Sequence, residues 1–452
     1  MASVKALTEK EFQDIPKEQW VEKTLKDLKA KPLESIYWNH PELGAIPPVF
    51  HPGEDIRSHT LPPRSYQGEN GDWQIRQAFG PEDGNALVIK SLMQGSQALC
   101  FEGVDKNSLA ELIKGVHLNM VHIHVPVSES MNAKDILEVL KGMVDNVSEL
   151  RGSFDFDPIS DSVDQGTSLD SMSSQVAQHL EQAMEAPHMK CVTVNAHRYF
   201  EAGMSDVQEL AVALLIGKRY IDHMMNAGLS IDDASARIEF SLSASNSYFM
   251  QIAKFRAMRI LWAKIISSYN PESDCSVVTW INAKGSTRYY DYRDIHNNLL
   301  RATTAAMAAA SGGADSIELP PITPWAKNED MLRWSRNIQH LLKEESWHNA
   351  VIDPANGSYY IEYLTSQLHD TAVELFEDWD GKDVFSSDEA SQGLLDLVKK
   401  GAEQVRNAIR TNELTVVGVN KFVKEGVEKP NIASENGNLA PLMVALEDLG
   451  HE

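Results

Sequence analysis

The sequence has few cysteines and no long hydrophobic run. Its 452 residues include only three cysteines, Cys100, Cys191 and Cys275. Cysteines so few and so far apart are typical of buried thiols in a reducing compartment rather than of a disulfide framework. No stretch approaches the roughly 18 apolar residues of a transmembrane helix. The N-terminal segment is acidic, poor in Arg and without an apolar core, so we expect neither a signal nor a transit peptide, and a cytoplasmic protein.

Positive charge is also scarce. The chain has 41 Lys and Arg against 65 Asp and Glu, a formal net charge of −24. Nucleic acids and anionic membranes select basic surfaces, so we expect neither as the main partner. The 42% hydrophobic and 23% charged content is ordinary for a soluble globular protein.

The stretch from Arg237 to Ile265 contains the repeating unit of the predicted fold. Residues 237–243 alternate apolar and polar side chains, which predicts a strand with one buried face. From Tyr248 the apolar residues recur at helical spacing and predict a long amphipathic helix with one apolar stripe. We expect the cations Lys254, Arg256 and Arg259 on the other faces of this helix. A strand that leads directly into such a helix is a βα unit of a parallel α/β fold.

Similar units recur from Trp73 onward, and eight strands alternating with helices predict a (β/α)8 TIM barrel. The predicted strands are Ala98–Glu102, Asn119–His124, Ser153–Phe156, Lys190–Val194, Arg237–Ser243, Cys275–Ile281, Ser316–Pro320 and a last one near Val351–Ile352. The predicted helices include Ser108–Lys114, Ala133–Asn146, Val207–Asn226, the helix from Tyr248, Leu299–Ser311 and Met331–Glu345.

Segments without this alternation flank the predicted barrel, which spans residues 73–378. Residues 1–72 combine a polar helix, whose narrow apolar seam includes Trp20 and Leu25, with a proline-rich stretch. We expect them to form an arm that wraps its own barrel or another subunit. Residues 379–452 predict a helical tail, with helices at Gly393–Arg410 and Leu439–Leu449.

The sequence contains none of the common catalytic motifs that would indicate a type of reaction. The sequence has no Walker or Rossmann phosphate loop, no Gly-x-Ser-x-Gly elbow and no His-Glu-x-x-His helix. Gly312 and Gly313 follow a predicted helix and suit its C-cap. His122 and His124 share one strand face, but no neighbouring acid or cysteine completes a metal site. We therefore favour a barrel-interior or hydrogen-bonding role for this pair.

Collinear blocks of the sequence nevertheless resemble the methylmalonyl-CoA mutase family. The clearest are IAKFRAMRILWAKI (252–265), IHNNLLRATTAAMAAASGGADSIEL (295–319), RNIQHLLKEES (336–346), VIDPANGSYYIEYLT (351–365) and VVGVNKF (416–422). Looser matches are WVEKTLKDLKAKPLESIYW (20–38), DWQIRQAFG (72–80) and EAGMSDVQELAVALLIGKRYI (201–221). The resemblance implies a barrel that holds an acyl-CoA while adenosylcobalamin, on a C-terminal flavodoxin-like domain, supplies the radical.

The cofactor-binding part of this pattern is not matched. The family's cobalamin domain carries an Asp-x-His-x-x-Gly loop whose histidine ligates cobalt. The nearest string here, Asp294 to Leu299, ends in Leu and lies in a barrel-helix block, so we interpret it as a chance match. The stretch beyond the predicted barrel is also shorter than the roughly 100 residues of a doubly wound domain. We therefore expect no cofactor-binding or metal-binding residues on this chain, and adenosylcobalamin on a partner.

The family's catalytic positions differ as well. The resemblance implies a catalytic tyrosine five residues before Trp73, where this chain has Gly68; Tyr66 is two residues out of register. It implies a catalytic histidine three residues before the Glu-Ala-Gly block, where this chain has Arg198. His197 is adjacent, but on a strand a one-residue shift turns a side chain to the opposite face. We therefore expect no catalytic residues on this chain.

Together these features indicate a non-catalytic small subunit of a heterodimeric methylmalonyl-CoA mutase. Its large subunit would interconvert (R)-methylmalonyl-CoA and succinyl-CoA, as in propionate metabolism. One alternative is an active acyl-CoA mutase barrel that uses cobalamin carried by a separate small protein. Another is an unrelated barrel enzyme or scaffold. The sequence leaves open whether the barrel interior still binds a CoA ester, and whether Arg76, His197 or Arg198 has a new role.

Overall fold

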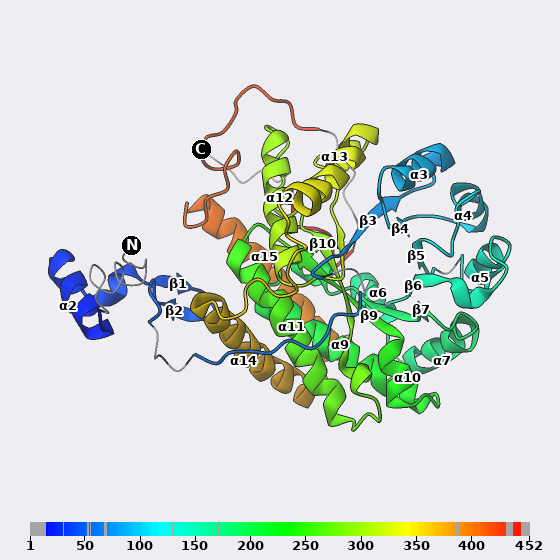
Figure 1. The fold of residues 1–452 in the computed structure, drawn as a ribbon, viewed down its shortest axis with the longest axis horizontal. Helices are drawn as coiled ribbons and strands as arrows, with labels where there is room; N and C mark the ends of the chain where they lie inside the picture. Colours follow the sequence, from blue (N-terminus) through cyan, green and yellow to red (C-terminus); the bar gives the residue numbers. More distant parts are fainter. Residues whose placement is uncertain are drawn as a thin grey trace, which may run out of the picture.

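The computed structural model describes residues 15–29, 31–51, 54, 56–66, 70–128, 130–169, 171–385, 388–430 and 437–443. Its centre is a parallel β-barrel surrounded by helices (Figure 1). The barrel strands are β3 Gln74–Phe79, β4 Ala98–Phe101, β5 His122–Pro126, β6 Arg151–Asp155, β7 Met189–Lys190, β8 Val192–Val194, β9 Ile238–Ala244, β10 Trp280–Gly285 and β11 Ser316–Glu318.

The barrel is closed by one strand that is divided into two short pieces. β7 pairs with β6, β8 pairs with β9, and only Cys191 separates β7 from β8. Residues 189–194 therefore occupy a single strand position between β6 and β9. With that position counted once, eight parallel strands follow one another around the barrel in chain order. The predicted (β/α)8 barrel is confirmed.

Helices connect the strands and cover the barrel. They are α3 Gly84–Met93, α4 Lys106–Leu112, α5 Ala133–Lys141, α6 Pro158–Gln165, α7 Met172–Ala183, α8 His197–Ala202, α9 Asp206–Asn226, α10 Ile231–Ala236, α11 Tyr248–Ser268, α12 His296–Ser311 and α13 Glu329–His340. A π-helical turn, Leu341–Glu345, extends α13. Gly312 caps α12, as predicted, and Gly313 follows it with a φ of +85°, which favours glycine.

Three predicted elements are wrong. Val351 and Ile352 lie in an exposed bend, and the strand that completes the barrel is β3 instead, whose sequence QIRQAF is too polar to suggest a buried strand. β10 begins only at Trp280, because Asp274–Val277 form a 3₁₀ turn. Residues 439–443, the described part of the second predicted tail helix, are not helical.

The long helix α11 is buried on nearly all sides. It packs against α9 and α12, both of which were predicted as helices, and also against α14, Tyr359–Lys382. α14 extends past residue 378, where the predicted barrel region ends. The cations Lys254, Arg256 and Arg259 are at most 2% exposed. The expectation that α11 buries only one stripe is therefore wrong, since a second layer of helix covers its polar side.

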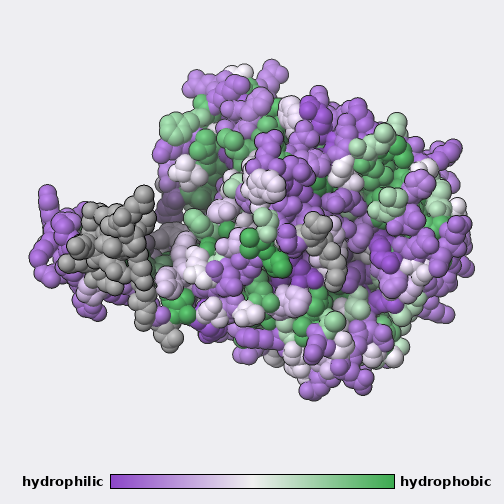
Figure 2. Space-filling view, viewed as in Figure 1, coloured by the Kyte–Doolittle hydropathy of each residue, from purple (hydrophilic) through white to green (hydrophobic). Residues whose placement is uncertain are grey.

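The N-terminal arm contacts its own barrel over part of its length. Arg57 and His59 lie against α14: Arg57 forms a two-pronged contact with Asp370, and the His59 amide donates to Glu362 (3.1 Å). In contrast, helix α2, Lys17–Asp27, projects away from the barrel (Figures 1 and 2). None of the α2 side chains is buried.

The hairpin β1 Trp38–His40 and β2 Gly44–Ile46 connects these two parts of the arm. At the other end of the chain, α15 Asp388–Arg410 is the predicted first tail helix. Within the described residues, no helix combines the length and apolar character needed to cross a membrane.

Candidate functional site

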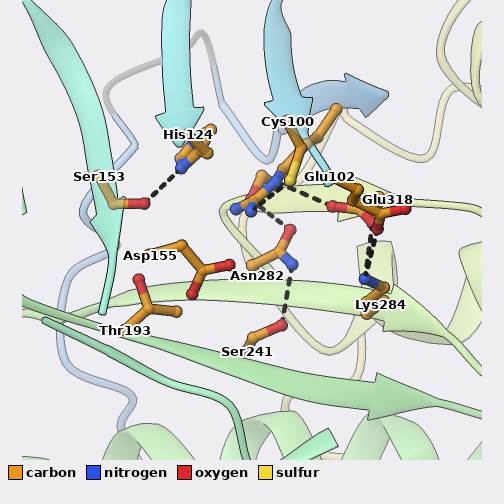
Figure 3. A network of polar contacts seen from close by, with 12 residues as sticks. Cys100, Glu102, His124, Ser153, Asp155, Thr193, Ser241, Asn282, Lys284 and Glu318 are labelled. Carbon is orange, nitrogen blue, oxygen red and sulfur yellow. Dashed lines mark hydrogen bonds and ion pairs between the residues drawn. The ribbon is translucent and has the colours of Figure 1, made fainter. Parts of the chain in front are cut away.

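Polar side chains fill the interior of the barrel. Almost every strand contributes at least one inward-facing polar group, and Figure 3 shows several of them converging. They are Arg76 on β3, Cys100 on β4, His124 on β5, Ser153 on β6, Thr193 on β8, Glu239 and Ser241 on β9, Asn282 and Lys284 on β10, and Ser316 and Glu318 on β11. The pleat explains this placement, because alternate residues of each strand face the axis.

Arg76 is the central cation of this network. Its Nε lies 2.9 Å from a carboxylate oxygen of Glu318, its Nη1 lies 3.6 Å from Glu239, and its Nη2 donates to the Cys100 sulfur at 3.4 Å. Arg76 is only 3% exposed. Burial alone would lower its pKa, but Cys100 and the carboxylates of Glu318 and Glu239 together outweigh burial and raise it. The guanidinium is therefore a permanent charge at the barrel axis.

Glu239 is the matching anion. It accepts hydrogen bonds from Ser153 (2.9 Å) and Thr193 (3.1 Å), and His124 Nδ1 lies 3.5 Å away. Burial opposes its ionisation, but His124 and Arg76 outweigh burial and lower the pKa of Glu239 to about 2. Burial lowers the pKa of His124 itself, so the fixed positive charge comes from Arg76.

The two histidines of β5 lie inside the barrel, as expected. His124 shares a hydrogen bond of 2.8 Å with Ser153. His122 stacks on Trp280, with ring centroids 5.3 Å apart, and burial lowers its pKa to about 3. Within the described part of the chain, no group of three or more His, Cys, Asp or Glu is placed to hold a metal ion.

This charged layer separates two cavities. One, of about 450 Å³, lies at the amino-terminal ends of the strands and is lined by Tyr66, His122 and Trp280. The other, of about 510 Å³, lies at the carboxyl-terminal ends and is lined by His197 and Lys284. A ligand extended along the barrel axis would have to displace the charged side chains between them.

Arg198, at the position where the resemblance implies a catalytic histidine, forms two ion pairs. Its Nη1 lies 2.7 Å from Asp161 and its Nη2 lies 2.6 Å from Asp164, both on α6. Burial and the charge of Asp157 raise the pKa of Asp161 to about 6, although Arg198 opposes this shift.

His197 shares the cavities of Arg198, contrary to the expectation that it faces the other way. Both residues lie in the first turn of helix α8, not on a strand, and both line the carboxyl-terminal cavity. Burial and the charges of Lys284 and Arg198 lower the pKa of His197 well below its usual value. The strand argument failed because the polypeptide turns helical directly after β8.

Two positions are related to the catalytic tyrosine of the family, Gly68 and Tyr66. Gly68 lies outside the described residues. Tyr66 lines the amino-terminal cavity, where its ring packs edge-on against Trp280 at 5.9 Å, so Tyr66 and Arg198 occupy opposite ends of the barrel.

The string beginning at Asp294 also does not fit a cobalamin loop. His296 is the first residue of barrel helix α12, its side chain is 73% exposed, and its Nδ1 lies 3.7 Å from Asp294. An exposed histidine on the outer wall of a barrel helix is not placed like a cobalt ligand in a binding loop. The described residues therefore do not fit adenosylcobalamin, and we derive no step through that group on this chain.

A sequence model of the family described as methylmalonyl-CoA mutase matches residues 104–440. The chain belongs to the methylmalonyl-CoA mutase family. The match starts in the loop between β4 and α4 and runs to the segment beyond α15, so it includes most of the barrel as well as the tail helix.

Similarity to individual proteins also supports membership of the methylmalonyl-CoA mutase family. The chain is 29% identical to a protein of Porphyromonas gingivalis named methylmalonyl-CoA mutase small subunit, over 93% of this chain and 72% of that protein. It is 31% identical to a small subunit of Streptomyces virginiae, over 68% of this chain and 52% of that protein. It is 26% identical to a methylmalonyl-CoA mutase of Cereibacter sphaeroides, over 89% of this chain and 64% of that protein. The chain thus spans less than two thirds of the latter two mutases.

The sequence interpretation missed the charged network inside this mutase-family barrel. Its signal was present in β9 and β10, where Glu239, Ser241, Asn282 and Lys284 recur at every second position. Such an alternation predicts one polar face, and in a closed barrel that face is the interior.

Proposed function

We propose that this chain is the small, non-catalytic subunit of a heterodimeric, adenosylcobalamin-dependent methylmalonyl-CoA mutase. Its large partner carries the cobalamin and interconverts (R)-methylmalonyl-CoA and succinyl-CoA. This chain stabilises the partner and contributes no catalytic, cofactor-binding or metal-binding residue. By itself it is inactive.

The observation that carries this proposal is the charged layer inside the barrel. In the family that the sequence resembles, the barrel holds the acyl-CoA, whereas here Arg76, Glu239 and Glu318 occupy the axis and are at most 3% exposed. Displacing Arg76 from its carboxylates would leave buried charges without partners, which is costly. The names of two similar proteins, both called small subunits, also support the proposal.

The N-terminal arm supplies the surface for the partner. Helix α2 has no buried side chain, and its apolar Leu25 and the preceding Ile15 are 42% and 54% exposed. An unpartnered apolar seam on a projecting helix suits burial against a second subunit. With contributions from the tail, we expect the interface to exceed the roughly 1,600 Å² of a standard complex. We accordingly divide the chain into an arm (1–72), a barrel (73–378) and a tail (379–452).

We place the complex in the cytoplasm. All three cysteines are free thiols; Cys100 and Cys191 are buried as expected, but the expectation is wrong for Cys275, which is exposed. Free, separated thiols suit a reducing compartment.

The test is reconstitution with a larger mutase subunit that contains the Asp-x-His-x-x-Gly sequence. The purified small chain should show neither a cobalamin absorbance spectrum after incubation and desalting nor any turnover of methylmalonyl-CoA. The two chains together should elute as a 1:1 complex with activity. Lys284→Met in the small chain should leave turnover of the complex within about twofold, because its barrel performs no chemistry.

Two results would contradict the proposal. Cobalamin retained by the isolated chain would be one. Turnover by this chain mixed with a small cobalamin-binding protein, without the large subunit, would be the other, and it would favour an active barrel with a separate cobalamin carrier.

A further inference from the structure

A short segment near the C-terminus lies at the carboxyl-terminal mouth of the barrel. Residues 437–443 follow the tail helix in sequence but lie against α6 and α8. Leu439, Ala440, Pro441 and Met443 line a cavity of about 540 Å³. This cavity shares His197, Arg198 and Lys284 with the cavity at the strand ends, so the segment forms one wall of the chamber at the barrel mouth.

Hydrogen bonds hold the segment at both ends. The Asn438 amide donates to the Asp164 carbonyl (2.9 Å), and the Leu439 amide donates to the Asp164 carboxylate (2.7 Å). The Asn438 side chain donates to the Val163 carbonyl at 3.1 Å. At the other end, the Leu442 amide donates to a backbone carbonyl in α8 at 2.7 Å.

Apolar side chains complete this attachment. Leu439 and Leu442 are 4% and 2% exposed, although they belong to a segment without regular structure. Burial of both residues removes apolar surface from water and holds the segment against the barrel.

Arg198 positions the carboxylate on which the segment depends. Its Nη2 binds one oxygen of Asp164, while the other oxygen accepts the Leu439 amide. Its Nη1 binds Asp161 one turn earlier on α6. Arg198 thereby joins α8, α6 and the segment, and it fixes the orientation of Asp164.

Gly437 fits closely at the start of the segment. Its φ is +150°, and a Cβ at this position would lie 2.3 Å from an oxygen of Asp164. A side chain here would force the anchoring carboxylate to shift, and the positive φ would strain it. The observed contact between the segment and Asp164 therefore favours glycine.

We propose that residues 437–443 form a latch that closes the carboxyl-terminal mouth of this barrel, with Asp164 as its anchor and Arg198 as the positioning residue. Chemistry in TIM barrels takes place at this face, so a partner that delivers a reactive group must approach it there. The latch occupies that approach. Arg198 thus has a structural task at the position where a catalytic histidine is expected by resemblance. This inference goes beyond the proposed function and depends only on the contacts of the chain itself.

Amide hydrogen exchange of the full-length chain, read by mass spectrometry over peptides containing residues 437–443, tests the latch. Arg198→Ala removes the positioning group, and Gly437→Ala pushes against the anchor without removing any charge. Each should speed exchange in the latch by roughly tenfold, the factor expected for one charge-assisted hydrogen bond. The exchange rate of the latch in Arg198→Lys, which can still pair with Asp164, should fall between the rates in Arg198→Ala and in the native chain.

The matched control is Arg219→Ala, which breaks another arginine–aspartate pair, with Asp383, away from the latch. It should leave exchange in the latch unchanged. Circular dichroism and thermal melting identify any variant that fails to fold, and Gly437→Ala still tests the latch if Arg198→Ala does not fold. Native exchange rates in a folded Arg198→Ala or Gly437→Ala variant would overturn the proposal. Complex formation with a large subunit is a separate measurement, so failure of the proposed function would be distinguishable.

Discussion

Removal of Arg76 should destabilise the protein severely. Arg76→Ala takes away the cation that faces both Glu239 and Glu318, at 3.6 and 2.9 Å. Glu318 keeps Lys284 at 3.2 Å, but Glu239 is 1% exposed and keeps only neutral hydrogen-bond partners. Breaking a buried ion pair by removing one partner costs about 3–5 kcal/mol. Folded proteins are stable by about 5–15 kcal/mol, so this loss is a large fraction of the total.

Urea unfolding followed by tryptophan fluorescence measures this loss. The control is Arg57→Ala, whose pair with Asp370 is 52% and 47% exposed. Exposed pairs contribute about 0–1 kcal/mol, so the control should unfold close to the native midpoint. The double variant Arg76→Met, Glu239→Gln should recover part of the loss, because it removes the orphaned charge and fills the space.

A change below about 1 kcal/mol for Arg76→Ala would refute this reasoning. It would mean that water or another cation already neutralises Glu239, and that the barrel axis is not sealed by an ion-pair layer. The proposal that the barrel excludes an extended CoA ester would then lose its physical basis.

Three further variants test other parts of the structure. Ile260→Asp places a carboxylate without a partner at a position of α11 that is 8% exposed, and it should abolish cooperative unfolding, while Ile260→Val should cost only about 1 kcal/mol. Lys254→Met leaves the buried Glu209 and the partly buried Asp206 of α9 without their cation and should cost about 3–5 kcal/mol in urea unfolding, against less than about 1 kcal/mol for the exposed Lys23→Met. The pKa of His122 is lowered from 6.5 to about 3 in the folded protein. The stability that the neutral, buried imidazole contributes is therefore complete above pH 6.5, and it is lost as the pH falls from 6.5 toward 3. Between pH 6.5 and 5, the native protein should therefore lose about 2 kcal/mol more stability than His122→Asn; equal losses would contradict the burial of this imidazole.

Local patterns along the chain were sufficient to predict the alternation of strands and helices. Period-two residues in β9 and helical spacing in α11 are local patterns, and each can be recognised within one element. The collinear blocks likewise gave the family, because they preserve the order of residues along the chain. Strand β3 was not predicted, because its inward residues, Gln74 and Arg76, are polar and become buried only when the other seven strand positions close the barrel.

The roles of the charged residues, in contrast, depend on contacts that form when distant elements fold together. Glu362 is 106 residues from Arg256, and Asp164 is 275 residues from Leu439, so neither contact is visible in any local pattern. Burying each such charge is unfavourable until its partner arrives from a distant element. The physical reason is the range of the interactions: propensity and periodicity act over a few neighbouring residues, whereas ion pairs and barrel closure require the whole chain to fold.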